Sequence, residues 1–221
     1  LDGPGQRALE RDCPRPDWTL CAFKDRLPPI EDDILFGDTG TVTQAGGYKV
    51  VAPQAGPIIM SAIRAEPLNV LRDALRHTLQ QFISFKSGDA LIVPMESADE
   101  RWRADLPAAE VARYHASKQY RLIPLLPEPL QAVHLGVGSV ALFVLAIGGL
   151  VALRQRDTFG GLYAAIAAAL VANAFVAGAL SGVFNRYQSR FVWLAAFAML
   201  MMLLAWWRLL YRDRIGAPAR A

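Results

Sequence analysis

Long apolar runs without charge dominate the last third of the chain. Residues 129–153, 158–185 and 191–207 contain no charged side chain, and the runs are 25, 28 and 17 residues long. A helix needs roughly 20 apolar residues to cross a bilayer, and lipid offers no partner for unpaired backbone groups. The pattern therefore predicts three membrane-spanning helices in a transmembrane region at 129–214. We expect them at about 130–153, 159–184 and 191–211, with a short tail at 215–221.

Residues 1–128 follow another pattern, which predicts a mostly helical domain outside the membrane. From residue 67 onward, apolar side chains recur at spacings of three and four, as in an amphipathic helix. They are Leu68, Leu71, Leu75, Leu79 and Phe82. This stripe fits two interpretations: packing inside the exterior domain, or contact with the lipid headgroup zone.

The first 57 residues contain seven of the 14 prolines and seven of the 17 glycines. Turn signals at this density predict a mostly irregular segment. We expect one or two short extended pieces, for instance at 41–43 and 48–51, and a first helix at 58–65. The fold class is therefore mainly α, with an irregular Pro/Gly-rich N-terminal part, a helical exterior domain and three transmembrane helices.

Charge is distributed unevenly along the chain. Residues 1–128 hold 15 Lys and Arg against 18 Asp and Glu, whereas residues 129–221 hold eight Arg against two Asp. Six of these Arg flank the spans on one side: Arg154 and Arg156 between the first and second spans, and Arg208, Arg212, Arg214 and Arg220 after the third uncharged run. The other two lie in the opposite loop. The positive-inside rule then places the tail in the cytoplasm and residues 1–128 outside. We expect a multi-pass protein of the bacterial inner membrane with a periplasmic N-terminal domain, and no nucleic-acid partner.

Cys13 and Cys21 both fall in the predicted exterior part, where a disulfide can form and persist. We expect them to pair and to close a short, proline-containing loop. Their spacing does not match a metal site, and no metal or cofactor is expected. The chain shows no signal peptide before this part, so export would require a removed signal or earlier spans.

The second predicted span carries small residues at intervals of four. The stripe consists of Ala165, Ala169, Asn173, Ala177 and Ser181, and Gly178 and Gly182 form a G-x-x-x-G pair beside it. Small residues let helix backbones approach closely, and Asn can bond across such an interface. We expect this face to pack against another helix. An alternative is that Asn173 and His134 line a substrate or proton path.

The loop 185–190 between the second and third spans contains Arg186 and Arg190, on the side where cations are unusual. They could pair with the acidic exterior domain, or bind an anionic lipid or phosphate. The loop resembles, over six residues, the Arg-Tyr segment before late helices in polytopic lipid-linked sugar transferases. That resemblance implies an acidic residue in an early exterior loop, which we cannot place in this chain.

The sequence carries no nucleotide-binding or hydrolase motif. We therefore expect a non-catalytic subunit or assembly component of a larger membrane complex, in contact with the bilayer and with other subunits or further copies of itself. The alternative is the C-terminal part of a polytopic envelope enzyme or transporter that handles lipid-linked or anionic substrates.

Overall fold

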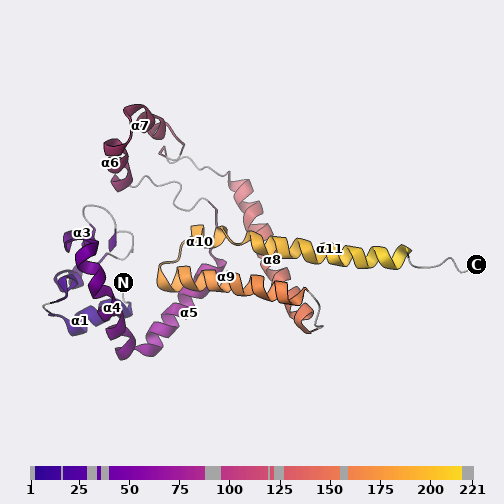
Figure 1. Ribbon diagram of the computed structural model, residues 1–221, viewed down its shortest axis with the longest axis horizontal. Coiled ribbons are helices and arrows are strands. Elements are labelled where there is room, and N and C mark those ends of the chain that lie inside the picture. Colours follow the sequence, from indigo (N-terminus) through magenta and orange to yellow (C-terminus); the bar gives the residue numbers. More distant parts are fainter. Residues whose placement is uncertain are drawn as a thin grey trace, which may run out of the picture. The chain divides into compact units, whose positions relative to one another are not determined.

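The computed structural model describes residues 3–15, 17–28, 34–35, 40–87, 96–118, 120–121, 127–154 and 159–215, which are mainly helical and contain no strand. The chain divides into two compact units (Figure 1). The first unit comprises Leu1–Arg76 and Leu91–Ile123, and the membrane unit comprises His77–Ala90 and Pro124–Ala221. His77–Ala90 thus belong to the same compact unit as the apolar helices, although they come earlier in the sequence.

The first unit begins with α1 (Pro4–Asp12), the 3-10 helix η1 (Thr19–Arg26), α3 (Thr41–Gln44) and α4 (Tyr48–Ala65). The long helix α4 packs against α1, and both contact η1. Buried apolar side chains in and beside these helices form two clusters. One consists of Phe23, Val42, Ala45 and Val51, and the other of Leu9, Trp18 and Ile58.

The predicted extended pieces at 41–43 and 48–51 are wrong, because these residues lie in α3 and at the start of α4. Gly46 and Gly47 have φ angles of 100° and 84°, a conformation that favours glycine, and their turn lets α4 begin at Tyr48. The helix then continues through Pro53 and Pro57, although an interior proline costs about 3 kcal/mol. Buried residues spaced three and four apart along α4 pack on α1 and η1, and this burial offsets the cost.

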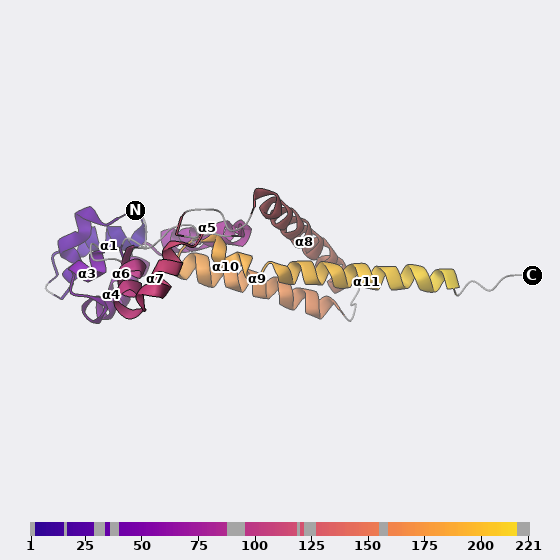
Figure 2. The same ribbon diagram turned by 90° about the horizontal axis from the view of Figure 1, so that it is seen from above.

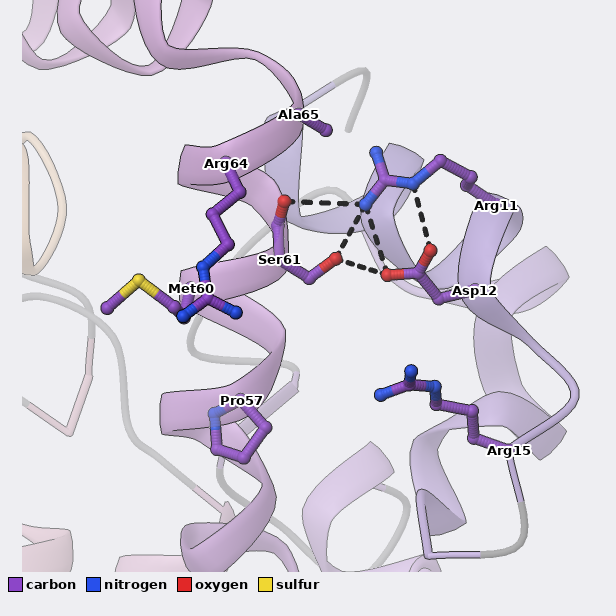
Figure 3. A pocket seen from close by; sticks show the side chains of 8 residues that line it. All are labelled: Arg11, Asp12, Arg15, Pro57, Met60, Ser61, Arg64 and Ala65. Atoms are coloured by element: carbon purple, nitrogen blue, oxygen red, sulfur yellow. Dashed lines mark hydrogen bonds and ion pairs between the residues drawn. The ribbon is translucent and has the colours of Figure 1, made fainter.

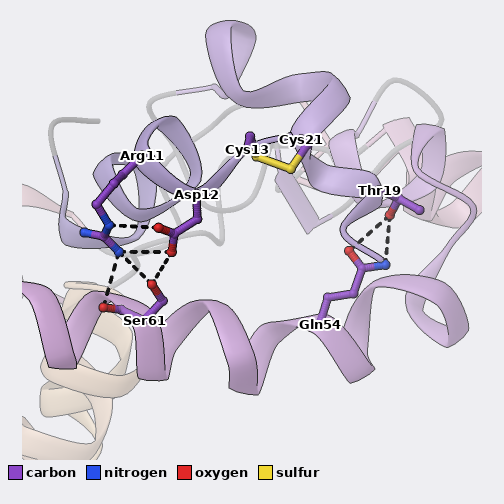
Figure 4. The surroundings of a disulfide bond; sticks show 7 residues. All are labelled: Arg11, Asp12, Cys13, Thr19, Cys21, Gln54 and Ser61. Carbon is purple, nitrogen blue, oxygen red and sulfur yellow. Dashed lines mark hydrogen bonds and ion pairs between the residues drawn. A yellow bond between two sulfur atoms is a disulfide. The ribbon is translucent and has the colours of Figure 1, made fainter. Parts of the chain in front are cut away.

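Cys13 and Cys21 lie at disulfide distance, with their sulfur atoms 2.05 Å apart, and link the end of α1 to η1 (Figure 4). A hydrogen bond links η1 to α4 as well: the Gln54 amide donates to the Thr19 hydroxyl over 3.0 Å. The same amide donates to the Val50 carbonyl over 2.9 Å. Both links hold η1 in place, one to the end of α1 and the other to α4.

The rest of the first unit contains α6 (Glu96–Asp105) and α7 (Ala108–His115), which pack against each other. His115 Nε2 lies 2.6 Å from an oxygen of Asp99, and Arg103 forms an ion pair with the same carboxylate at 2.7 Å. The hydrogen bond to His115, with a contribution from Arg103, lowers the pKa of Asp99. The ring of Trp102 meets Tyr114 edge-on at 4.1 Å. His115 therefore has a partner on the neighbouring helix that sequence spacing does not suggest.

The membrane unit is built from α8 (Glu128–Arg154), α9 (Gly160–Leu180), α10 (Asn185–Ser189) and α11 (Trp193–Ile215). Within the described residues, three helices are long and apolar enough to cross a membrane: α8, α9 and the run through α10 and α11. Figures 1 and 2 both show α9 and α11 side by side, with α8 crossing them. Their core consists of Ala141, Leu145, Ala152, Tyr163, Ile166, Leu170, Ala195 and Ala198.

The helix α5 (Pro67–Ile83) is continuous, and the boundary between the two units falls within it, so its last turns belong to the membrane unit. The predicted amphipathic helix is therefore present. Of the apolar stripe predicted on it, only Phe82 packs against the core of the spans. The other four stripe residues are exposed. The second predicted span ends at Leu180 rather than at 184, because the chain leaves the helix there and forms α10.

Candidate functional site

The end of α5 contacts α9 at Gly178, near the C-terminal end of that helix. A Cβ atom at position 178 would lie 2.5 Å from the carbonyl oxygen of His77 and 2.7 Å from the Cβ of Gln81. Real Cβ atoms do not approach other atoms so closely, so this contact requires a glycine. The two helix backbones therefore touch at this point, which is what small residues permit.

Gln81 joins α5 to the segment between α9 and α10. Its side chain is fully buried, at 0% exposure. The side-chain amide donates to the carbonyl of Phe184 over 2.9 Å, and its oxygen accepts from the Phe184 N–H over 2.8 Å. One residue further on, the Asn185 side chain accepts a hydrogen bond from the Lys86 N–H over 3.0 Å. Both backbone groups of Phe184 thus find their partners on a side chain that lies 103 residues earlier.

The segment after α5 is also bonded to α8. Phe85 is buried, and its ring occupies the space that a Cβ at Gly138 would need, 2.7 Å away. His134 Nε2 lies 2.9 Å from the Phe85 carbonyl, and the Gln131 amide donates to the Ser87 carbonyl over 2.6 Å. The contact of His134 with a carbonyl makes its Nε2 the protonated nitrogen.

On the other side of α10, Asn173 and Gln188 form a pair. The Asn173 amide donates to the Gln188 side-chain oxygen over 2.7 Å and to the Tyr187 carbonyl over 3.3 Å. Gln188 is fully buried, and its amide lies 3.5 Å from the Leu170 carbonyl. These hydrogen bonds hold α10 against α9.

These groups meet at one end of the spans, and we call them the polar junction. The polar junction consists of Gln81, Phe85, His134, Asn173, Gly178, Phe184 and Gln188. Burying so many amide groups is tolerated because each finds a partner. Its chemistry is that of positioning: it fixes the end of α5 and the helix α10 to α8 and α9.

The predicted small-residue face of α9 divides into two parts. Ala177, Gly178 and Gly182 are buried and Asn173 is half-buried, whereas Ala165, Ala169 and Ser181 are exposed. The buried part faces α5 and α10 rather than another span, as the contacts of Gly178 and Asn173 show. The exposed part, which includes Ala165 and Ala169, continues along the helix toward Gly160.

Arg186 and Arg190 lie at the two ends of α10. The guanidinium of Arg186 lies 4.3 Å from the ring centroid of Phe184 and 5.2 Å from that of Tyr187, and the side chain is half-buried. Such stacking orients a guanidinium while leaving its donors at the edge of the plane. Among the described residues, neither Arg186 nor Arg190 forms an ion pair.

The first unit contains a pocket of about 470 Å³ between α1 and α4 (Figure 3). Arg11 donates to the Ser61 hydroxyl over 2.6 Å, and this hydroxyl donates to Asp12. The hydrogen bonds from Arg11 and Ser61 lower the pKa of Asp12, and the Asp12 carboxylate raises the pKa of Arg11, so both stay charged at neutral pH. Arg15 and Arg64 also line the pocket and add two further positive charges.

Sequence reasoning did not find this pocket, because its residues come from helices that lie about 50 positions apart. It also missed Gln81, Phe85 and Gln188 of the polar junction. Gln81 lies on the side of α5 opposite the predicted leucine stripe, where an amphipathic pattern predicts contact with water and not full burial. Nothing in the sequence indicates that the partner of this amide is the backbone of Phe184.

The described residues contain no group of three side chains suited to hold a metal ion. Comparison of the chain with protein-family models, with curated proteins and with solved structures finds no match. The functional interpretation therefore depends on the surfaces and contacts of the chain itself.

Proposed function

We propose that this chain is a multi-pass membrane protein that acts as a non-catalytic subunit or assembly component of a larger membrane complex. In this role α9 docks against a helix of another subunit or of a second copy. The observation that carries the proposal is an exposed surface of small residues on α9, which we call the docking face. It consists of Gly161, Ala165, Ala168, Ala169 and Ala172.

The docking face differs from the exposed surface of α11, where the exposed apolar side chains are large, among them Phe197, Leu203, Leu204 and Trp206. On α8, large exposed side chains such as Phe143 and Ile147 occur together with the small residues Ala132, Gly136 and Ala146. Large side chains suit contact with fluid lipid, whereas a row of Gly and Ala lets a second helix approach closely. At most 33% of the most apolar stretch of each span is buried within the chain, which leaves the docking face available to a partner.

The polar junction supports the same proposal. It fixes the end of α5 to α8, α9 and α10 through hydrogen bonds at Gln81, His134 and Asn173. A rigid connection of this kind would hold the last turns of α5 in a constant orientation on the spans, which suits a protein that presents a surface to other subunits.

For location, we propose the bacterial inner membrane, with the first unit in the periplasm and the C-terminus in the cytoplasm. The support is the distribution of Arg: Arg154 and Arg156 precede α9, and Arg208, Arg212, Arg214 and Arg220 lie at the end of the chain. Cytoplasmic loops are enriched in such residues. A disulfide between Cys13 and Cys21 is also consistent with an oxidising compartment.

Enlarging the docking face should disrupt assembly without unfolding the chain. We expect Ala169→Leu and Ala165→Leu to reduce the yield of the complex about tenfold, equivalent to about 1.4 kcal/mol of docking free energy, because the added side chains prevent close helix approach. The measurement is the mass of the protein after gentle detergent extraction, by light scattering and by mass spectrometry of what accompanies it. Val171→Phe, an enlargement at an exposed position beside the docking face, is the control. Equal yields of complex from all three variants would remove the docking face from the proposal.

A second candidate function is that of a C-terminal part of an envelope enzyme or transporter that handles lipid-linked or anionic substrates. The observation that favours it is Arg186, which is oriented by the rings of Phe184 and Tyr187 and has no ion pair among the described residues. Under this alternative, Arg186→Ala would abolish turnover or transport of such a substrate in cells and leave assembly intact. Under the proposed function, Arg186→Lys and Arg186→Ala would both leave the mass and composition of the complex unchanged.

A further inference from the structure

One side of α5 is apolar and exposed. Leu68, Leu71, Leu75, Leu79 and Ile83 recur at spacings of three and four, so they lie in a line along the helix. Their side chains are between 54% and 78% exposed. Single exposed leucines are ordinary on a protein surface, whereas five in one line form a patch that commonly meets a partner or a membrane. We call this line the leucine face.

At Leu79, within the membrane unit, the leucine face points away from α9. His77 and Gln81 contact Gly178 of α9, and Leu79 lies midway between them in the sequence. Residues two positions apart on an α-helix, at 3.6 residues per turn, point to nearly opposite sides. Leu79 is accordingly 68% exposed while Gln81 is fully buried.

The contact with α9 also defines the depth at which α5 meets the spans. α9 has 21 residues, and at 1.5 Å per residue it is about 32 Å long, close to the roughly 30 Å thickness of the hydrocarbon core. Gly178 lies two residues before the end of this helix at Leu180. A membrane crossed by α9 therefore has one of its polar boundaries at about the position where α5 touches it.

Two cations lie along one edge of the leucine face. Arg72 and Arg76 are one turn apart and both are exposed. Neither forms an ion pair among the described residues. Arginine at this edge can bury its aliphatic stem beside leucines while the guanidinium stays at the level of lipid phosphates. An apolar face with basic residues beside it is typical of helices that lie in the membrane interface.

We propose that α5 lies along the membrane surface, with the leucine face between the headgroups and the acyl chains and with Arg72 and Arg76 at the lipid phosphates. This inference does not depend on the docking face, which lies on α9, because it concerns only α5. The sequence left two interpretations of the apolar stripe, packing in the exterior domain or contact with lipid. We choose lipid, because the leucine face extends to the end of α5 that is bonded to the spans.

The test uses site-directed spin labels on the full chain in nanodiscs of phosphatidylcholine and phosphatidylglycerol. Both cysteines of the chain are in the disulfide, so under non-reducing conditions an introduced cysteine is the only reactive thiol. Leu75→Cys and Leu79→Cys probe the leucine face, and Gln80→Cys, at the exposed neighbouring position, is the matched control. Leu204→Cys on α11 supplies a reference for a lipid-facing position. Collision rates with oxygen, which enters lipid, and with a water-soluble nickel chelate are measured for each label.

We expect the ratio of oxygen to nickel collisions at Leu75 and Leu79 to be several-fold higher than at Gln80 and to approach that at Leu204. A ratio equal to that at Gln80 would place the leucine face in water and overturn the proposal. Low collision rates with both reagents would show that protein covers the face, which also overturns it. Leu71→Cys replaces either label if that variant does not reach the nanodisc, since all these positions are exposed and tolerate a change of side chain.

Discussion

Replacing Gly178 with leucine is expected to separate α5 from α9 and to lower the stability of the membrane unit by about 3 kcal/mol or more. The space for a side chain at this position is already occupied by the carbonyl of His77, 2.5 Å from where a Cβ would lie. Backbone atoms cannot rotate aside as the end of a flexible side chain can. The helix α5 would have to move, and Gln81 would move with it.

The measurement for Gly178→Leu is reversible unfolding of the purified chain in mixed detergent micelles, followed by tryptophan fluorescence. Gly136→Leu on α8 is the control, because Gly136 is exposed and no atom lies within 4 Å of its Cβ position. We expect this control to unfold as the unmodified chain does, or slightly later, since leucine favours a helix over glycine. Equal stability of both variants would mean that α5 does not pack on α9.

The second large effect is expected for Gln81→Leu. Leucine fills a similar space but cannot bond to the backbone, so the part-buried N–H and C=O of Phe184 would lose the partners seen at 2.8 and 2.9 Å. A fully buried group left unpaired costs about 1–3 kcal/mol, so the loss from these two part-buried groups should be up to about 6 kcal/mol. Because α10 begins one residue after Phe184, its amide hydrogens should also exchange faster with deuterium.

Hydrogen exchange and unfolding of the same variant separate a local from a global effect. Gln80→Leu is the matched control, since Gln80 is exposed and adjacent, and exposed substitutions usually change stability by less than about 0.5 kcal/mol. If exchange at 184–189 were the same in both variants, the bond between Gln81 and Phe184 would not hold α10 in place.

The membrane-spanning helices could be predicted because the signal is local. Each of the uncharged runs 129–153, 158–185 and 191–207 approaches or exceeds the roughly 20 apolar residues that a helix needs to cross a bilayer. The amphipathic helix from Pro67 and the pairing of Cys13 with Cys21 were likewise readable from spacing and count. The ends of these helices were predicted less precisely: α9 ends at Leu180, four residues before the predicted end at 184.

The remainder depended on contacts between distant residues. Proline and glycine indicated an irregular segment at 1–57, whereas burial of Val51 and Ile58 against α1 and η1 makes α4 helical through both of its prolines. Among the small residues predicted to pack closely, Gly178 meets the backbone of His77 in α5, a partner that the spacing along α9 does not indicate. An amide that bonds a backbone 103 residues away, as Gln81 does, leaves no periodic trace in the sequence.

Accessibility of single cysteines on the two sides of the spans tests most directly whether this chain crosses a membrane in the proposed orientation. Arg190→Cys lies at the α10 end of the spans, and Arg208→Cys lies 15 residues into α11, close to its aromatic residues Trp206 and Trp207. We predict that a membrane-impermeant maleimide labels Arg190→Cys in intact spheroplasts and labels Arg208→Cys only after the membrane is permeabilised. Labelling of Arg208→Cys in intact spheroplasts, or recovery of the unmodified chain from a detergent-free soluble extract, would contradict it.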